Sequence, residues 1–212
     1  KLIAAGTLLP SVLAGVGPDV SLFEGDPLEY AIRDAVMPLN DFEGFDEVCE
    51  RYVPEALTPV TLYGKTYGLP DSMTFTMLFY RKDIMADLGL EIPRTWDELI
   101  ALIPTLMANN MHLGMYNDSL IFQYQMGGQL WADDGMRINY DSTTALEAFE
   151  TLCGFYKNYS LDYQYDFANR FRTGEMPLGI AQYTTYNQLS VFASELSGLW
   201  GFTTMPGTVR ED

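Results

Sequence analysis

The stretch from Tyr63 to Glu98 constrains the fold of this chain more than any other part, because several local signals follow one another in it. Residues 59–69 are predicted to form a hairpin that turns at Gly64-Lys65, since β-forming residues flank a glycine turn. A polar break follows Pro70, and a second strand is predicted at residues 76–80. This order is typical of a chain that crosses from one lobe to another past a ligand.

Two helices follow the second strand. The first is predicted at residues 82–88 and ends at Gly89, which can take the left-handed conformation that closes helices. The next begins at Thr95, whose hydroxyl can accept a hydrogen bond from the amide of Glu98 while the Glu98 side chain reaches back. Its apolar stripe assigns Trp96 to packing rather than to a ligand, and consists of Trp96, Leu99, Ile100, Ile103 and Met107.

The rest of the chain alternates between helices and strands, which is the signature of an α/β protein. Asp26 is the expected cap of a helix that starts at Pro27, and Asp141 the expected cap of a long helix. The further helices are expected at 8–14, 27–35, 119–126, 142–159, 166–172 and 186–193. The further strands are expected at 19–23 (buried), 113–116, 177–182 and 199–205, with a hairpin turning at 133–135.

Composition excludes several classes of partner. The chain has 212 residues, and its 12 basic and 29 acidic residues give a net charge of −17. Such a charge disfavours nucleic acid and anionic membrane surfaces, which repel an acidic chain before local contacts form. Cys49 and Cys153 show neither a CxxC nor a metal spacing. Because Cys153 shares a helical face with Leu146, Phe149 and Tyr156, both thiols are predicted to be buried and inert.

Signatures of catalysis, metals and cofactors are mostly absent. His112 is the single histidine, has no recognisable nucleophile partner and is expected to be structural. Gly15-x-Gly17 lacks the third glycine of a dinucleotide loop, and no GxxxxGK phosphate loop occurs. Asp133-Asp-Gly135 resembles a calcium loop only superficially, because Arg137 falls where an oxygen ligand is needed. We therefore expect no enzyme, no cofactor and no metal site.

Five segments carry a resemblance to a known family. They are Gly64-Lys-Thr-Tyr-Gly-Leu-Pro70, Phe79-Tyr-Arg-Lys-Asp83, Pro93-Arg-Thr-Trp-Asp-Glu-Leu99, Gly17-Pro-Asp-Val20 and the helix-to-strand step from Phe171 to Ile180. In order and spacing they resemble the extracellular solute-binding proteins of ABC importers, in particular the family that includes maltose-binding protein. Members of that family often carry tryptophan at the position of Phe23 and near Tyr186.

The resemblance implies an α/β, periplasmic-binding-protein-like type II fold with two lobes. Residues 1–72 are expected to form an incomplete first lobe, residues 73–205 the second lobe, and residues 206–212 the start of a return crossing to lobe one. Family members have a strand and helix before the position of Lys1 and continue after about Pro206. We therefore expect an excised portion, whose uncovered apolar edges either associate with a second copy or leave the chain unable to bind ligand.

Candidate ligand-binding residues follow from the rule that ligands collect outside the carboxyl ends of strands in open α/β sheets. Sugars have apolar faces that stack on aromatic rings and hydroxyl groups that need polar partners, so aromatics beside short polar residues suit a carbohydrate. The resemblance implies aromatic and acidic contacts at Phe23, Asp26 and 183–186. The full candidate set is Phe23, Glu24, Asp26, Asp71, Ser72, Thr74, Asn117, Phe122, Tyr183, Thr184 and Tyr186.

The function implied by the resemblance is that of a receptor, which captures a sugar or oligosaccharide between two lobes and delivers it to ABC permease subunits. It implies a location outside the cytoplasm, and we expect tethering to the membrane through a segment absent from this chain. Two alternatives remain open at this point. One is a carbohydrate-active hydrolase that uses a pair of carboxylates, and the other is a non-transporting ligand-sensing domain of a larger surface protein.

Overall fold

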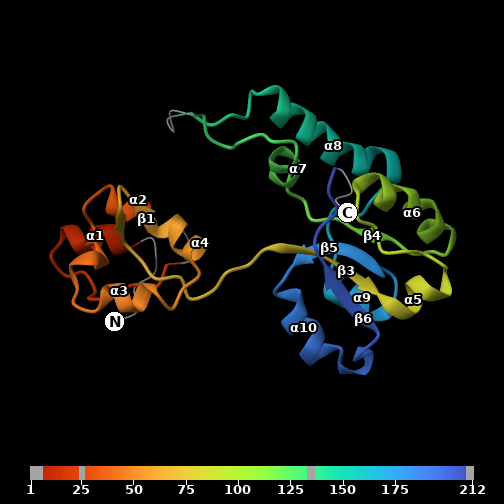
Figure 1. The fold of residues 1–212 in the computed structure, drawn as a ribbon, viewed down its shortest axis with the longest axis horizontal. Coiled ribbons are helices and arrows are strands. Elements are labelled where there is room, and N and C mark those ends of the chain that lie inside the picture. Colours follow the sequence, from red (N-terminus) through yellow and green to blue (C-terminus); the bar gives the residue numbers. More distant parts are fainter. Residues whose placement is uncertain (1–6, 24–26, 133–136, 209–212) are drawn as a thin grey trace. The chain divides into compact units, whose positions relative to one another are not determined.

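The computed structural model describes residues 7–23, 27–132 and 137–208. The chain divides into two compact units, Lys1–Met73 (unit 1) and Thr74–Asp212 (unit 2), and Figure 1 shows their elements in sequence colours. The boundary expected between residues 72 and 73 lies one residue before this division.

The described part of unit 1, residues 7–23 and 27–73, consists of short helices and one small hairpin. The hairpin pairs β1 (Thr61–Leu62) with β2 (Lys65–Thr66) in antiparallel register. Its turn is formed by Tyr63 and Gly64, which both have positive φ, as a two-residue hairpin loop requires. The hairpin is therefore as expected, with its turn one residue earlier. The helical elements are α1 (Leu8–Leu13), α2 (Leu28–Ala31), η2 (Leu39–Asp41), α3 (Phe45–Cys49), α4 (Pro54–Leu57) and η3 (Thr58–Val60).

The strand predicted at residues 19–23 does not form, which corrects the sequence analysis. These residues are irregular, and Val20 is 85% exposed instead of buried. A strand needs a neighbour to take up its backbone hydrogen bonds, and within residues 7–23 and 27–73 the only strand pair is β1–β2. Helix α2 also covers only part of the expected range 27–35, and its expected cap Asp26 lies outside the described residues.

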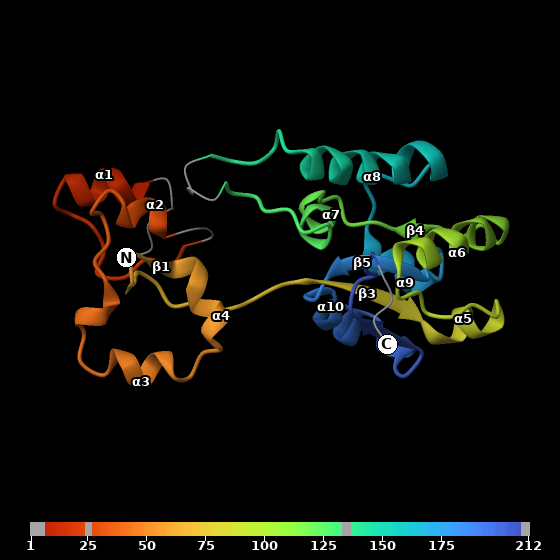
Figure 2. The ribbon, with the colours of Figure 1, turned by 45° about the horizontal axis from the view of Figure 1, so that its top comes forward.

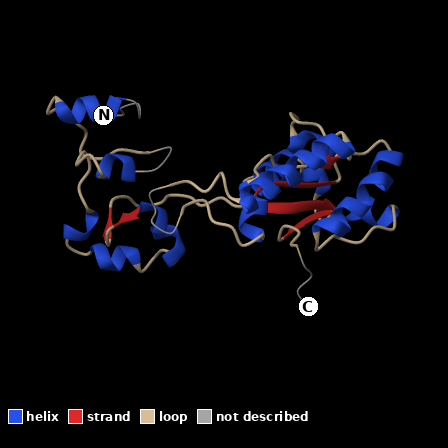
Figure 3. Ribbon diagram, turned by 90° about the horizontal axis from the view of Figure 1, so that it is seen from above, coloured by secondary structure: helices blue, strands red, loops and turns tan. Residues whose placement is uncertain are grey.

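Unit 2 contains a four-stranded sheet with strand order β4-β5-β3-β6. Strand β3 spans Thr76–Arg81 and lies antiparallel to both β5 (Leu178–Gln182) and β6 (Trp200–Thr203). Strand β4 (Leu113–Gly114) runs parallel to β5. Helices lie on both sides of these strands in Figure 3. The sheet is thus mixed, and its central pair, β3 and β5, joins the beginning of unit 2 to residues 178–182.

Alternate residues of β3 enter two different cores. Leu78 packs on one face with α6 (Trp96–Ala108), α7 (Leu120–Gln125) and α8 (Thr143–Tyr159). Its neighbour Phe79 packs on the other face with α9 (Phe167–Thr173), α10 (Thr185–Phe192) and η4 (Ser194–Leu196). Figure 2 shows α6, α7 and α8 on one side of the strands and α10 on the other. Both faces of the sheet are therefore covered, as the period of two along a strand requires.

The helix boundaries of unit 2 agree closely with the sequence, with one correction. Helix α5 (Lys82–Asp87) ends near Gly89, which has φ 64°. Helix α6 has the predicted capping box between Thr95 and Glu98. Helix α8 is capped by Ser142, whose hydroxyl accepts from the Ala145 amide, and not by Asp141. Asp141 instead pairs with Arg137 at 3.0 Å on the surface.

Two predicted apolar faces are corrected by the structure. Cys153 is exposed, because α8 buries the face that carries Ala145, Ala148, Leu152 and Phe155, and Cys49 at the end of α3 is half-buried. In α6 the buried stripe ends with Leu106, and Met107 is exposed. The turn predicted at 133–135 lies outside the described residues, although Trp131 and Ile138 form an antiparallel bridge on either side of it.

Phe167 packs directly onto the backbone of two neighbouring strands. A Cβ added to Gly179 in β5 would lie 2.3 Å from Phe167 Cε2, and one added to Gly114 in β4 would lie 2.8 Å from Phe167 Cδ2. Only glycine leaves room for this ring. The close approach explains why the helix-to-strand segment from Phe171 to Ile180 needs Gly179.

Arg81 connects the end of β3 to the end of α9. Its guanidinium is buried and donates to both carboxylate oxygens of Asp83, at 2.9 and 2.6 Å, and to the carbonyls of Phe171 and Arg172. The hydrogen bond from Arg81 lowers the pKa of Asp83 below its ordinary value. The Tyr-Arg-Lys-Asp segment therefore has a structural role in unit 2, because it links β3 to the end of α9.

The last described residues still pack within unit 2. Gly207 pairs with Thr95, its carbonyl accepts from the Trp96 amide at 3.0 Å, and its own amide donates to the Arg94 carbonyl at 2.9 Å. The return crossing expected at 206–212 stays a prediction, since residues 209–212 lie outside the described residues.

Candidate functional site

One edge of the sheet in unit 2 gathers the residues that follow three strands. Because β4 runs parallel to β5, both carboxyl ends reach the same edge. Gln182 at the end of β5 pairs with Thr76 at the start of β3, and β6 likewise ends beside the first half of β3. The carboxyl ends of β4, β5 and β6 therefore meet the amino end of β3, so the residues that follow these three strands share one edge of the sheet.

Stacked aromatic rings occupy this edge. Phe75 precedes β3 and stacks on Tyr183, which follows β5, with ring centroids 5.1 Å apart and planes at 18°. Tyr183 in turn stacks on Tyr186 at 5.7 Å and 5°. We call these three rings, Phe75, Tyr183 and Tyr186, the aromatic ladder. The Tyr183 amide donates to the Phe75 carbonyl at 2.8 Å, which fixes the backbone of the two segments that carry the first two rings.

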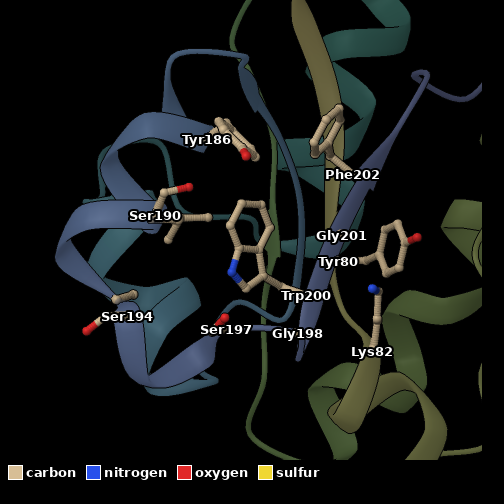
Figure 4. A pocket seen from close by; sticks show the side chains of 12 residues that line it. Tyr80, Lys82, Tyr186, Ser190, Ser194, Ser197, Gly198, Trp200, Gly201 and Phe202 are labelled. Atoms are coloured by element: carbon tan, nitrogen blue, oxygen red, sulfur yellow. The ribbon is translucent and has the colours of Figure 1, made fainter.

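The inner end of the aromatic ladder continues into the core. Tyr186 meets Trp200 and Phe202 edge-on, both at 5.7 Å. Figure 4 shows these three side chains around a pocket of about 460 Å³, which also has Ser190, Lys82 and Tyr80 in its wall. Its volume lies in the range of small-molecule sites. Each of its lining residues belongs to unit 2.

Polar groups near the end of β4 are uncharged or already engaged. Gln182 Nε2 donates to the Tyr116 hydroxyl at 2.9 Å, and the Tyr165 hydroxyl donates to the Met115 carbonyl at 2.8 Å. Burial raises the pKa of Tyr165 to about 12, so it is neutral at physiological pH. The Asp118 carboxylate accepts from the Leu120 amide at 2.9 Å at the start of α7. These hydrogen bonds hold the segments at the edge in place, and the same polar groups can offer hydrogen bonds to a neutral ligand.

The predicted site residues of unit 2 fall into two groups. Asn117, Thr184, Tyr183 and Tyr186 lie in the segments that follow β4 and β5, with Asn117 and Thr184 exposed. Phe122 is different, because it is 1% exposed and packs between Trp96 and Phe155 in the core under α6, α7 and α8. A ligand at the surface cannot reach its ring, so Phe122 is corrected to a core residue.

The candidates from the first part of the chain are distributed as follows. Phe23 is half-buried and lies against Tyr30, with ring centroids 5.2 Å apart, in an irregular segment. Glu24 and Asp26 lie outside the described residues. In the segment predicted to cross between the lobes, residues 69–76 (the crossing segment), Asp71, Ser72 and Thr74 are exposed, and the Ser72 hydroxyl donates to Asp71 Oδ1 at 3.1 Å.

Phe75 is the residue that sequence reasoning missed. The sequence places it directly before a strand, whereas the ligand rule selects residues that come after strands. It joins the site because β3 runs antiparallel to β5, so its amino end lies beside Gln182. The signal in the sequence that could have identified Phe75 is an aromatic residue directly after the candidate Thr74, at the end of the crossing segment.

The described residues carry neither a metal site nor a membrane-spanning helix. No three His, Cys, Asp or Glu side chains among them converge as metal ligands. None of the helices within residues 7–23, 27–132 and 137–208 is long and apolar enough to cross a bilayer.

Comparison with known proteins identifies the family. Residues 3–208 match the family model described as bacterial extracellular solute-binding protein. A putative binding protein of Brucella abortus is 28% identical over 144 residues, which cover 66% of this chain and 35% of the relative. The galactooligosaccharide-binding protein of Bacillus subtilis is 32% identical over 85 residues, which cover 40% of this chain and 19% of the relative.

Solved structures share the fold. An ABC transporter solute-binding protein from Thermotoga lettingae, bound with α-D-tagatose, matches with TM-score 0.76 and 22% identity over 97% of this chain and 58% of its own. The maltose-bound MalE3 of T. maritima matches with TM-score 0.76 and 21% identity over 94% of this chain and 55% of its own.

The chain thus spans about a third of the length of the Brucella relative and somewhat more than half of these structures. The likeness confirms the predicted α/β, periplasmic-binding-protein-like class. Since the family model covers nearly all of its length, the chain belongs to the family of bacterial extracellular solute-binding proteins.

Proposed function

We propose that the protein captures a neutral sugar or oligosaccharide outside the cytoplasm and delivers it to the permease subunits of an ABC importer. The observation that carries this proposal is the aromatic ladder at the sheet edge, with uncharged polar side chains beside it. Stacked rings offer an apolar surface to the C–H face of a sugar, while the amide of Asn117 and the hydroxyl of Thr184 suit its hydroxyl groups.

The ligand class follows from the charge of the two segments that carry the aromatic ladder. The segments 74–76 and 182–187, which carry the aromatic ladder, contain no charged residue. Amino acids, polyamines and acidic sugars need a countercharge where they bind, since an unpaired charge loses its hydration on burial. A neutral polyhydroxyl ligand does not have this cost. The B. subtilis relative is named for binding galactooligosaccharides, and the two structural neighbours were solved with tagatose and maltose, which is consistent with the proposal.

Transport requires a partner that accepts the loaded receptor. We propose ABC permease subunits, because the family to which the chain belongs is extracellular and its structural neighbours include a protein described as an ABC transporter solute-binding protein. A segment outside this chain tethers the protein to the membrane.

Titration calorimetry of the full-length protein tests the proposal. The panel contains maltose, D-tagatose, a galactotriose, L-glutamate and putrescine. We expect saturable heat from at least one neutral sugar and none from the charged compounds. Saturable binding of glutamate or putrescine without any sugar would refute the proposed ligand class.

A turnover assay separates the receptor from the hydrolase alternative. Incubation with nitrophenyl glycosides of the bound sugar should release no nitrophenol above the buffer rate. Release that Asp71→Asn abolishes would replace the receptor with a glycosidase that uses this carboxylate.

A further inference from the structure

The three rings of the aromatic ladder differ in how much of their surface a ligand can reach. Tyr183 is the middle ring and contacts three other rings, namely Phe75, Tyr186 and Phe202, at centroid distances of 5.1, 5.7 and 5.4 Å. With so many ring neighbours, and half-buried as a residue, it has little ring area left for a sugar. Its hydroxyl remains the group most suited to a ligand contact.

Tyr186 is also surrounded by rings. It contacts Tyr183, Trp200 and Phe202, all at 5.7 Å, and it lines the pocket of Figure 4 beside Trp200. Its 38% exposure is lower than the 48% of Phe75. The ring packing of Tyr186 therefore serves mainly to connect the aromatic ladder to the core of unit 2.

Phe75 forms the open end of the ladder. Tyr183 is its single ring partner within residues 7–23, 27–132 and 137–208, and about half of the Phe75 side chain is exposed. The hydrogen bond between the Tyr183 amide and the Phe75 carbonyl holds the Phe75 backbone against the end of β5. A ring that is both exposed and fixed loses little entropy when a ligand stacks on it.

We propose that Phe75 is the residue on which the sugar ring stacks, and that Tyr183 is a positioning residue which holds Phe75 in place. This inference rests on the proposed function, since it assigns the stacking surface of the same site. The ligand is then a pyranose, because a six-membered ring presents a flat C–H face that a linear polyol of the same size lacks. The specificity for ring sugars resides in Phe75, and the tyrosines contribute polar contacts through their hydroxyl groups.

The test compares four forms of the full-length protein by calorimetry: wild type, Phe75→Leu, Phe75→Tyr and Phe149→Leu. Leucine keeps most of the apolar bulk of Phe75 and removes the aromatic face, whereas tyrosine keeps that face. Phe149 on α8 is the matched control, because it is a phenylalanine of similar exposure, 56%, outside the aromatic ladder. The titrants are D-galactose, maltose, and the linear polyol galactitol.

We expect Phe75→Leu to weaken the binding of the pyranose titrants about three- to tenfold, which is the usual contribution of an aromatic contact beyond its buried area. The affinity of Phe75→Tyr for the pyranose titrants should stay within about twofold of wild type, and the affinity of Phe149→Leu should equal that of wild type. The affinity for galactitol should be low and unchanged in all four forms. Near-ultraviolet circular dichroism checks that each variant keeps its aromatic packing.

The outcomes separate this inference from the proposed function. If wild type binds neither D-galactose nor maltose while the charged compounds of the earlier panel bind, both are wrong. If wild type binds a pyranose and Phe75→Leu binds it equally well, the stacking assignment to Phe75 is wrong and the receptor function stands. Loss of galactitol binding in step with pyranose binding would also contradict the inference, because it would indicate a structural role for Phe75 and not a ring-specific one.

Discussion

Replacing Gly179 with alanine tests the close packing that joins α9 to the sheet of unit 2. The new Cβ would lie 2.3 Å from Phe167 Cε2 and 3.0 Å from Gly114 Cα. Carbon atoms in contact prefer about 3.5–4.0 Å, so the ring has to move by more than about 1 Å. Strand β5 is hydrogen-bonded on both sides, to β4 and β3, and cannot move away. We expect Gly179→Ala to destabilise unit 2 by about 1–3 kcal/mol.

Gly154 in the middle of α8 is the matched control for this substitution. A Cβ at Gly154 would meet only Asn158 Nδ2 at 3.7 Å, an ordinary contact. Alanine favours a helix over glycine by about 0.5–1 kcal/mol, so Gly154→Ala should stabilise the protein. The same chemical change is thus expected to have opposite signs at two positions of one unit.

Urea unfolding followed by tryptophan fluorescence measures both effects, because Trp96, Trp131 and Trp200 all lie in unit 2. The shift of the midpoint at constant m gives the change in the free energy of unfolding. Phe167→Leu replaces the ring with a smaller branched side chain, and on that background Gly179→Ala should cost less than about 1 kcal/mol. An equal cost on both backgrounds, or a stabilising Gly179→Ala, would refute the packing argument.

Three further perturbations have defined outcomes. Ser142→Ala should destabilise the protein by about 1 kcal/mol through loss of the α8 cap, whereas Asp141→Ala should change the urea midpoint by less than half as much; equal effects would contradict the cap assignment. The folded pKa of Tyr165 is raised from 10.0 to about 12, so its contribution to stability is complete below pH 10 and is lost as pH rises toward 12. The free energy of unfolding should therefore fall between pH 10 and 12, and it should fall less steeply in Tyr165→Phe. If the free energy of unfolding falls equally steeply in both proteins, Tyr165 is not the group responsible. Cys153 is exposed and should react with a maleimide in the native protein, as mass spectrometry can show after proteolysis; protection of Cys153 would contradict the observed face of α8.

Sequence was most informative where the determining interactions are local. The capping box of α6 involves residues three apart, and the Gly89 turn after α5 needs only one residue with positive φ. Strand β3 is short and rich in β-forming residues, and it lies where the pattern predicted it. These elements depend on neighbours within a few positions, which the sequence displays directly.

The failed predictions depended on distant neighbours. Val20 lies in the segment predicted as a buried strand, but no strand within the described part of unit 1 pairs with it. Cys153 lies on one of two apolar stripes of α8, and only the packing of α6 and α7 decides which stripe is buried. Phe122 follows the end of β4 as a binding residue would, yet it fills the space between Trp96 and Phe155.

The candidate site was predicted only in part for the same reason. The rule of carboxyl ends placed Tyr183 and Tyr186 at the sheet edge, because Tyr183 follows β5 directly and Tyr186 lies in the first turn of α10, the next helix. The position of Phe75 depends on the antiparallel pairing of β3 with β5, which brings Thr76 beside Gln182 from a distant part of the chain. A sequence pattern cannot show which strand end lies beside which.

A crystal structure of the full-length protein with the neutral sugar that gives the largest heat tests the central claim most directly. The account predicts electron density for a sugar ring at the sheet edge of unit 2, stacked on Phe75 and within hydrogen-bonding distance of Asn117 or Thr184. Density for the sugar away from this edge, with the aromatic ladder unoccupied, would contradict it.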